Sequence, residues 1–273
     1  MTKQDAINLL TQKDQLQLLS FYDTLTPQQQ ENLLAQIEGI DWSLLDVLKT
    51  HETVNARGTF APLSAMELSQ IDANRAHLEE VGLQAIREGK VAAVLLAGGQ
   101  GTRLGFDKPK GMYNIGVTRE LYIFECLINN VMEIVKKAGA WIPFYIMTSD
   151  KNYDDTTAFL KEKNYFGYNV EYIHFFKQEM APSVDYNGKL LMEAPDRLSL
   201  SPNGNGGWFL SMKKSGLLEL IDKRGIEWLN VFAVDNVLQS IADPVFVGAV
   251  LEGDYSVGSK VIRKVSPQEK VGV

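Results

Sequence analysis

The stretch Val91-Ala-Ala-Val-Leu-Leu-Ala-Gly-Gly-Gln-Gly-Thr-Arg-Leu-Gly105 decides the fold of this sequence. Its first six residues form an apolar run typical of a fully buried strand. Glycines follow at positions 98, 99, 101 and 105, where the backbone can take conformations closed to other residues and can approach a ligand closely. A buried strand that runs directly into such a loop predicts a turn that can wrap phosphates with its amide groups.

Two cations belong to the same segment. Arg103 offers a forked set of donors for phosphate oxygens, and Lys110 carries a compact positive charge directly after Pro109, which stiffens the chain. The plain alternative is a tight strand-to-helix turn with surface cations. The glycine spacing differs from that of a G-x-G-x-x-G dinucleotide fingerprint, and Lys110-Gly111 reverses the Gly-Lys order of a P-loop, so both of these nucleotide folds are disfavoured.

Short apolar runs alternate with helical stretches from residue 90 onward. This rhythm predicts an α/β fold with a mostly parallel sheet flanked by helices. The expected strands are 91–96, 141–147, 170–176, 228–234 and 255–262, and the expected helices are 121–138, 156–163, 208–222 and 244–252. Asn187-Gly188 lies between β-prone flanks and predicts a hairpin.

Residues 1–89 have a different texture. Apolar residues recur at helical spacing, and Thr26-Pro27-Gln28-Gln29 resembles a capping box with proline at the first helical position. We therefore predict an N-terminal helical region, 1–89, followed by an α/β domain, 90–273.

Composition limits the partners. The formal net charge of −7 gives no general field that would collect nucleic acid or anionic lipid, so phosphate binding needs a locally built site. No apolar stretch is long enough to span a bilayer, and neither an export nor a membrane signal is visible. The single cysteine, Cys126, fits a reducing compartment, and the three scattered histidines suggest no zinc site. We expect a cytoplasmic protein; the sequence does not give its oligomeric state.

The loop also carries a family resemblance. Leu96-Ala-Gly-Gly-Gln-Gly-Thr-Arg-Leu-Gly105 with Pro109-Lys110-Gly111 resembles the signature loop of sugar-nucleotide pyrophosphorylases, in the form of the UDP-N-acetylhexosamine (UDP-N-acetylglucosamine) pyrophosphorylase branch. The similarity continues through 144–149, 175–182, 201–207 and 234–237 and covers almost the whole chain. It implies a Rossmann-like, GT-A-like nucleotidyltransferase fold.

The resemblance also implies roles for individual residues. Arg103 and Lys110 would act as the catalytic cations on the phosphates, and Asp235 would hold Mg²⁺ next to UTP. The residues that would bind the nucleotide are Leu96, Ala97, Gly98 and Gly99 through main-chain groups, Gln178 and Gly204 at the uracil edge, Asn205 at the base or ribose, and Asp235. In isolation, an Asp-Asn pair after a strand is more often a turn, and Gln178 or a Gly-Asn-Gly-Gly loop is ordinary.

The implied reaction joins UTP to an N-acetylhexosamine 1-phosphate and releases pyrophosphate. An ionised sugar phosphate is already a nucleophile, so in-line attack on the α-phosphorus needs alignment and charge compensation rather than a histidine or cysteine base. Three alternatives remain: the sugar could be glucose 1-phosphate or one of several sugars, the chain could bind UTP without transferring it, or it could be an NAD-type binding protein.

Two departures from the family pattern bear on activity. Family members continue beyond the position of Val273 into an asparagine-containing loop that closes the sugar pocket, so we expect the chain to lack the family's C-terminal part. Glu179 stands where related sequences often have glycine, and its carboxylate could alter the nucleotide fit.

Overall fold

The computed structural model describes residues 1–43, 45 and 65–269. The chain forms two compact units. Unit 1 combines the range 1–63 with 179–206, and unit 2 combines 64–178 with 207–273. This division differs from the boundary expected near Gly89, because α4 (Leu68–Arg87) packs within unit 2 and the hairpin segment 179–206 belongs with the N-terminal helices.

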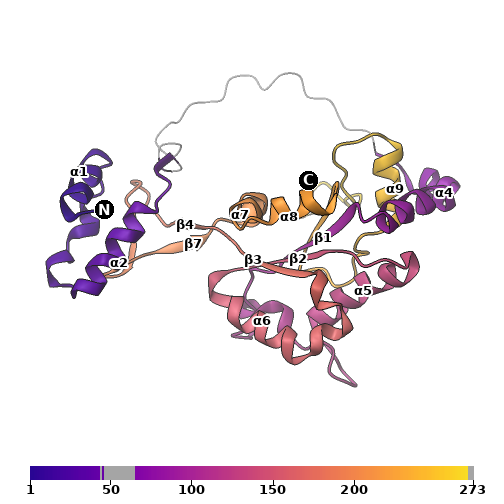
Figure 1. The fold of residues 1–273 in the computed structure, drawn as a ribbon, viewed down its shortest axis with the longest axis horizontal. Coiled ribbons are helices and arrows are strands. Elements are labelled where there is room, and N and C mark those ends of the chain that lie inside the picture. The colour runs from indigo at the N-terminus through magenta and orange to yellow at the C-terminus, as the bar shows by residue number, and fades with distance from the viewer. Residues whose placement is uncertain (44, 46–64, 270–273) are drawn as a thin grey trace. The chain divides into compact units, whose positions relative to one another are not determined.

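Unit 2 is built on a four-stranded sheet with the order β3-β2-β1-β8 (Figure 1). Its strands are β1 (Val91–Leu96), β2 (Phe144–Thr148), β3 (Ile173–Lys177) and β8 (Trp228–Ala233). All three neighbouring pairs run parallel, which confirms the predicted α/β class.

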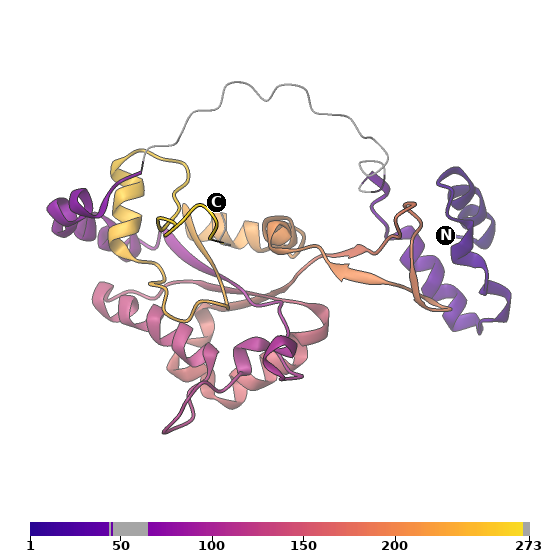
Figure 2. The ribbon, with the colours of Figure 1, turned by 180° about the vertical axis from the view of Figure 1, so that it is seen from behind.

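Helices cover both faces of this sheet, as Figure 2 shows from behind. They are α4, α5 (Ile123–Ala138), α6 (Tyr153–Glu162), α7 (Trp208–Lys214), α8 (Leu217–Arg224) and α9 (Pro244–Glu252). Alternate β1 residues explain the two layers: Val91, Ala93 and Leu95 pack with α5 and α6, whereas Ala92, Val94 and Leu96 pack with α7 and α8. Because successive strand side chains point to opposite faces, a strand buried on both sides reads as a continuous apolar run.

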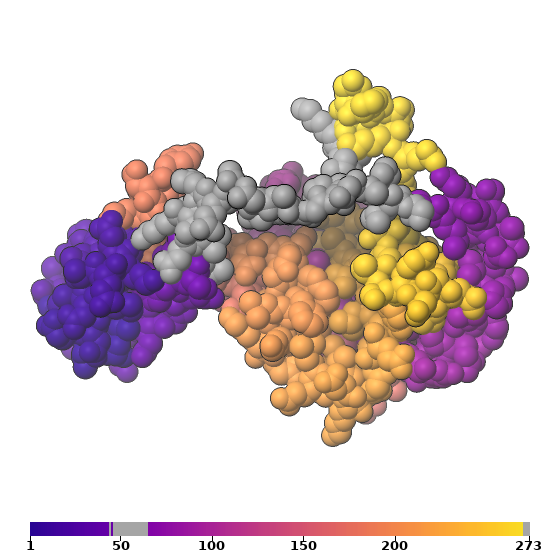
Figure 3. All heavy atoms as spheres, turned by 90° about the horizontal axis from the view of Figure 1, so that it is seen from above, coloured from indigo at the N-terminus to yellow at the C-terminus, as the bar shows by residue number. Residues whose placement is uncertain are grey.

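Two glycines set the crossing of α4 and α9. A Cβ at Gly82 would lie 1.9 Å from the carbonyl oxygen of Pro244, and one at Gly248 would lie 1.8 Å from that of Leu78. The two helix backbones therefore touch directly. The chain after α9, yellow in Figure 3, carries exposed apolar side chains, among them Val257, Val261 and Ile262.

The described part of unit 1 contains two α-helices and two strand pairs. The helices are α1 (Lys3–Gln12) and α2 (Pro27–Glu38), and the strands are β4 (Met180–Pro182) with β7 (Leu200–Pro202) and β5 (Met192–Ala194) with β6 (Arg197–Leu198). Short 3-10 helices occur in both units, at Leu16–Leu19, Tyr22–Thr24, Thr102–Leu104, Lys110–Met112, Asp150–Asn152, Asn164–Gly167, Val170–Tyr172 and Asn205–Gly207.

Glutamine side chains fasten the hairpin of unit 1 to its helices. Gln15 is buried, donates to the carbonyl of Gly188 at 2.8 Å and accepts from the amide of Leu190 at 2.9 Å. Gln36 makes the same two-way contact, donating to Asp196 at 2.9 Å and accepting from the Leu198 amide at 3.0 Å. Each side-chain amide thus pairs with the backbone as a neighbouring strand would, and it satisfies backbone groups that are buried or partly buried.

Most expected elements are present, and two expectations are wrong. Thr26 caps α2 with Pro27 at the first helical position, and Val184 pairs with Leu190 around the predicted Asn187-Gly188 turn. The expected strand 255–262 is irregular chain. The expected helix 208–222 is two helices, because Gly216 has a φ of +76° and interrupts it.

Candidate nucleotide-binding site

The order of the strands marks one edge of the sheet as a place for a ligand. From β1 the chain moves outward to β2 and then β3, whereas β8 lies on the other side of β1. Leu96 at the end of β1 is aligned with Ala233 at the end of β8. Ligands of open parallel sheets bind beyond the carboxyl ends of the strands, where the strand order reverses. The glycine loop and Asp235 both follow this edge.

The glycine loop folds back on itself. The amide of Gly101 donates to the carbonyl of Lys108 at 2.9 Å, and the amide of Lys110 donates to that of Gly99 at 3.2 Å. Gly105 takes the left-handed conformation, with a φ of +67°, at the end of the 3-10 helix Thr102–Leu104. Most of the segment 99–108 is exposed, so the predicted phosphate loop is not sealed inside the core.

Packing beneath the loop positions Lys110. Pro109 is buried, and the next residue but one, Gly111, lies so close to Phe124 of α5 that a Cβ would meet its ring at 2.3 Å. Phe106 and Tyr113 support the loop from either side of this point with an edge-to-face contact, their ring centroids 5.5 Å apart. The chain around Lys110 is therefore held against the core while its side chain stays 27% exposed.

Asp235 meets Lys110 at the carboxyl edge. The amide of Val234 still donates to the carbonyl of Leu96 at 3.2 Å, which carries the pairing of β8 and β1 one residue past the strand. Asp235 follows, its side chain is 63% exposed, and its carboxylate forms an ion pair with the Lys110 ammonium. The structure thus brings together two of the predicted phosphate- and metal-binding groups.

Gln178 reaches the same loop from β3. Gln178 is buried, and its main-chain N–H donates to the carbonyl of Thr148 at 2.6 Å. Its side-chain oxygen would lie only 2.6 Å from a Cβ added to Gly98. A side chain at position 98 would therefore displace the Gln178 side chain from its present place. This contact joins two of the predicted nucleotide-binding residues, although the reading of a uracil edge by Gln178 stays a prediction.

The remaining predicted residues are more loosely defined. Arg103 is exposed on the 3-10 helix Thr102–Leu104, and its contact with phosphate stays a prediction. Gly204 and Asn205 belong to unit 1, where Gly204 has a φ of +83° and Asn205 begins the short helix Asn205–Gly207. Their proximity to a bound base is likewise a prediction.

Three amide side chains missed by the sequence reasoning hold the site loops. Asn152 is buried and donates to the carbonyl of Ala97 at 3.1 Å. Beyond Asp235, Gln239 donates to Ala233 at 3.0 Å, and Asn130 of α5 donates to the carbonyls of Val237 and Gln239. An isolated Asn or Gln carries no sequence signal for such a role, because its partners are main-chain atoms whose position depends on the fold.

The side chains at this edge suit a magnesium ion that is held by one carboxylate together with substrate phosphates. Within the described ranges, no group of three or more His, Cys, Asp or Glu side chains is placed to hold a metal. Magnesium needs no such cage, since it is commonly bound by one or two carboxylates together with substrate phosphates and water. The exposed carboxylate of Asp235 fits that role.

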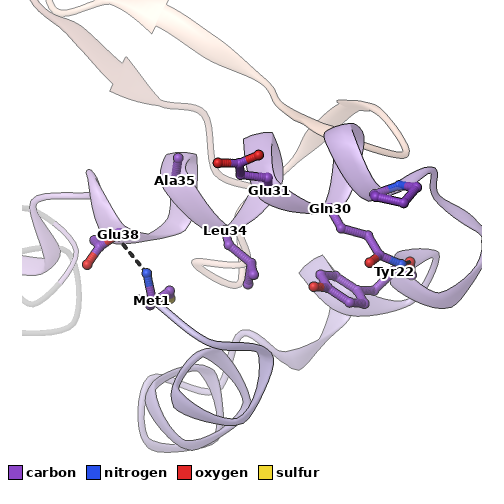
Figure 4. A pocket seen from close by; sticks show the side chains of 8 residues that line it. Met1, Tyr22, Gln30, Glu31, Leu34, Ala35 and Glu38 are labelled. Carbon is purple, nitrogen blue, oxygen red and sulfur yellow. Dashed lines mark hydrogen bonds and ion pairs between the residues drawn. The ribbon is translucent and has the colours of Figure 1, made fainter.

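A separate hollow of about 420 Å³ lies in unit 1 (Figure 4). The amino group of Met1 donates to Glu38 at 2.9 Å across it. The residues that line it are Met1, Tyr22, Pro27, Gln30, Glu31, Leu34, Ala35 and Glu38, none of which is a predicted site residue.

A parallel α/β sheet with a glycine loop, a lysine and an aspartate at its switch point defines a nucleotidyltransferase-type fold. The chain belongs to the UTP–glucose-1-phosphate uridylyltransferase family, whose model matches residues 30–273.

Named relatives narrow the branch. UDP-N-acetylglucosamine diphosphorylase 2 of Arabidopsis thaliana is 35% identical over 99% of this chain and 57% of its own length. UDP-N-acetylglucosamine pyrophosphorylase of Saccharomyces cerevisiae is 36% identical over 98% of this chain and 60% of its own length. The resemblance read from the loop is confirmed. The chain spans somewhat more than half the length of these curated relatives.

A solved structure gives the same result. The UDP-N-acetylglucosamine pyrophosphorylase of Trypanosoma brucei, in complex with an inhibitor, superposes with a TM-score of 0.73 at 30% identity, covering 93% of this chain and 55% of that one. Among the helices in the described part of the chain, none is long and apolar enough to cross a membrane. The cytoplasmic location stays a prediction.

Proposed function

We propose that this chain is the nucleotide-binding part of a uridylyltransferase that joins UTP to N-acetylglucosamine 1-phosphate and releases pyrophosphate. The observation that carries the proposal is the meeting of Lys110 and Asp235 beside the glycine loop at the switch point of the sheet. The names of the relatives at 35–36% identity support the choice of sugar.

The reaction places its demands on charge and alignment. The sugar phosphate oxygen attacks the α-phosphorus of UTP in line, the new P–O bond forms, and the bond to the β-phosphate oxygen breaks as pyrophosphate leaves. Anions must approach each other, so the protein has to offset charge where it develops. Main-chain amides of the glycine loop, the Lys110 ammonium and the Arg103 guanidinium perform this task in our proposal.

Asp235 would hold a magnesium ion, whose charge would offset that of the phosphates. In this structure the Asp235 carboxylate is paired with the Lys110 ammonium. A magnesium ion on the same carboxylate would compete with that ion pair, and the ammonium would then be available to a phosphate oxygen. Uridine selectivity would come from Gln178, whose side-chain amide can match the uracil edge. The roles that the resemblance implies for Gly204 and Asn205 stay predictions.

A second candidate, a glucose-1-phosphate enzyme, is favoured by the description of the family model itself. The nucleotide loop reports little on the sugar, because fold and nucleotide site can serve several acceptors. A third candidate is a protein that binds UTP without transferring it, which the limited coverage of the relatives keeps open.

One experiment separates these candidates. The chain is incubated with UTP, magnesium and either N-acetylglucosamine 1-phosphate or glucose 1-phosphate, and pyrophosphate release is measured beside UTP binding by calorimetry. Our proposal predicts binding together with faster release for the acetamido sugar. Faster release with glucose 1-phosphate supports the second candidate, binding without release supports the third, and no UTP binding would contradict all three.

A further inference from the structure

Asn152 lies at the point where β2 meets the glycine loop. It is fully buried, with 0% of its surface exposed. Its side-chain oxygen accepts from the amide of Ser149 at 2.7 Å, and its side-chain nitrogen donates to the carbonyls of Ala97 at 3.1 Å and Gly99 at 3.5 Å. One amide group therefore binds the turn after β2 and two alternate carbonyls of the loop.

These contacts fix the direction of two peptide planes. In a trans peptide the C=O of one residue and the N–H of the next point in opposite directions. With the carbonyls of Ala97 and Gly99 turned inward to Asn152, the N–H groups of Gly98 and Gln100 point the other way. The Gly99 carbonyl also accepts from the main-chain N–H of Lys110 at 3.2 Å. Asn152 and Lys110 are therefore linked through one carbonyl group.

The buried Asn152 restricts the backbone conformations of a loop that its glycines would otherwise make flexible. The segment 98–101 contains three glycines and could adopt many backbone conformations, each of which would direct its amides differently. The donor atoms of Asn152 select one of them. Selection before the ligand arrives lowers the ordering cost of binding.

We propose that Asn152 is a positioning residue that orients the main-chain N–H groups of the glycine loop toward the nucleotide phosphates. It touches no substrate and acts only through the peptide planes of Ala97 and Gly99. The inference rests on the proposed function, because the ligand whose binding it controls is UTP.

The decisive variant is Asn152→Asp. An ionised aspartate still accepts from the Ser149 amide but has no proton to donate to the loop carbonyls. We expect UTP affinity at pH 8 to fall roughly tenfold, the effect of losing about one to two hydrogen bonds. A buried carboxyl beside carbonyl oxygens has a raised pKa, so lowering the pH protonates it and restores one donor. Affinity should then recover as the pH falls toward about 6, relative to the unaltered chain.

The matched control is Asn74→Asp, the same chemical change on the exposed surface of α4. It should leave UTP affinity unchanged at every pH. A merely structural role for Asn152 predicts lower thermal stability without recovery of affinity at low pH. Unchanged UTP affinity in a folded Asn152→Asp variant would overturn the proposal. If that variant does not fold, Asn152→Ala removes the donors without adding a charge, and normal UTP affinity in it would equally overturn the proposal.

A second readout needs no nucleotide and separates this inference from the proposed function. Amide hydrogen exchange of the ligand-free chain should become faster at residues 97–101 in Asn152→Ala, while β1 and α5 stay protected. Faster exchange together with no UTP binding by the unaltered chain would support the positioning role and reject UTP as the ligand. Unchanged exchange in the loop would reject the positioning role whatever the ligand.

Discussion

The Lys110 ammonium and the Asp235 carboxylate form an ion pair although 125 positions of sequence separate them. The two side chains are 27% and 63% exposed. Partly exposed pairs of this kind contribute at most about 1 kcal/mol to stability. The pair is therefore better explained by the chemistry that a cation and a carboxylate perform together at the switch point of the sheet.

Replacement of Lys110 by alanine tests the phosphate role. Loss of a charge-assisted hydrogen bond removes about 1.5–3 kcal/mol, so UTP binding should weaken by roughly 10–100-fold. The free energy of unfolding should change by less than about 1 kcal/mol. Calorimetric titration and urea unfolding measure the two quantities. Lys108→Ala is the matched control, an exposed lysine two positions earlier, and equal losses in both variants would assign the effect to general charge.

Asp235→Asn tests the metal role. An amide is a poorer ligand for a hard cation than a carboxylate, so magnesium should no longer strengthen UTP binding. The comparison is the ratio of UTP affinities with and without magnesium, in the chain and in the variant. Asp107→Asn, at an exposed carboxylate of the same loop, should keep the full ratio. An unchanged ratio in Asp235→Asn would place the ion elsewhere.

Gly82→Ala tests the direct contact of α4 with α9. The added methyl group would lie 1.9 Å from a backbone oxygen of Pro244, which has no flexible side chain to move aside. We expect a loss of about 2–3 kcal/mol in the free energy of unfolding. Gly39→Ala, whose added Cβ would have an ordinary contact of 3.5 Å, is the control. Equal stability of the two variants would show that the helices can separate at no cost.

His174 should make the free energy of unfolding depend on pH. Burial lowers the pKa of its imidazole, with Arg224 adding to the effect, and its ring stacks on Tyr145 with centroids 5.2 Å apart. The unfolded chain then binds the proton more readily than the folded one. The stabilisation is complete above the ordinary histidine pKa of about 6.5 and is lost as the pH falls through it toward the lower, folded value.

Urea unfolding between pH 8 and pH 5 measures this dependence. His174→Phe keeps an aromatic ring but cannot take up a proton, so its stability should fall less steeply with acid. His77→Gln, at an exposed histidine of α4, should follow the unaltered chain more closely. A His174→Phe curve that is parallel to that of the unaltered chain would contradict the assignment.

The sequence predicts the centre of the sheet well because β1 and β2 are buried along their whole length. The run 91–96 is a continuous apolar segment, as expected of a strand covered by helices on both faces. The segment 255–262 also contains β-prone residues, Tyr255, Val257, Val261 and Ile262, but it is exposed, irregular chain in the structure. Its β-prone residues indicate that the segment can form a strand. They do not indicate whether the fold supplies a neighbouring strand to pair with it.

The sequence motifs of the candidate site were predicted, whereas the side chains that hold its loops in place were not. The glycine loop leaves a local pattern, so Gly98 and Lys110 could be named in advance, whereas Asp235 was named only through the family resemblance. Asn152 and Asn130 could not, because each binds main-chain carbonyls brought near by folding. The grouping of the hairpin 179–206 with the N-terminal helices was missed for the same reason: it depends on Gln15 and Gln36, whose partners are more than 150 positions away.

The most direct test of the central claim is a calorimetric titration of the chain with UTP, CTP, ATP and GTP, each with and without magnesium. The account predicts saturable binding at one site, tightest for UTP and strengthened by magnesium. Equal affinity for all four nucleotides, or no binding of UTP, would contradict it.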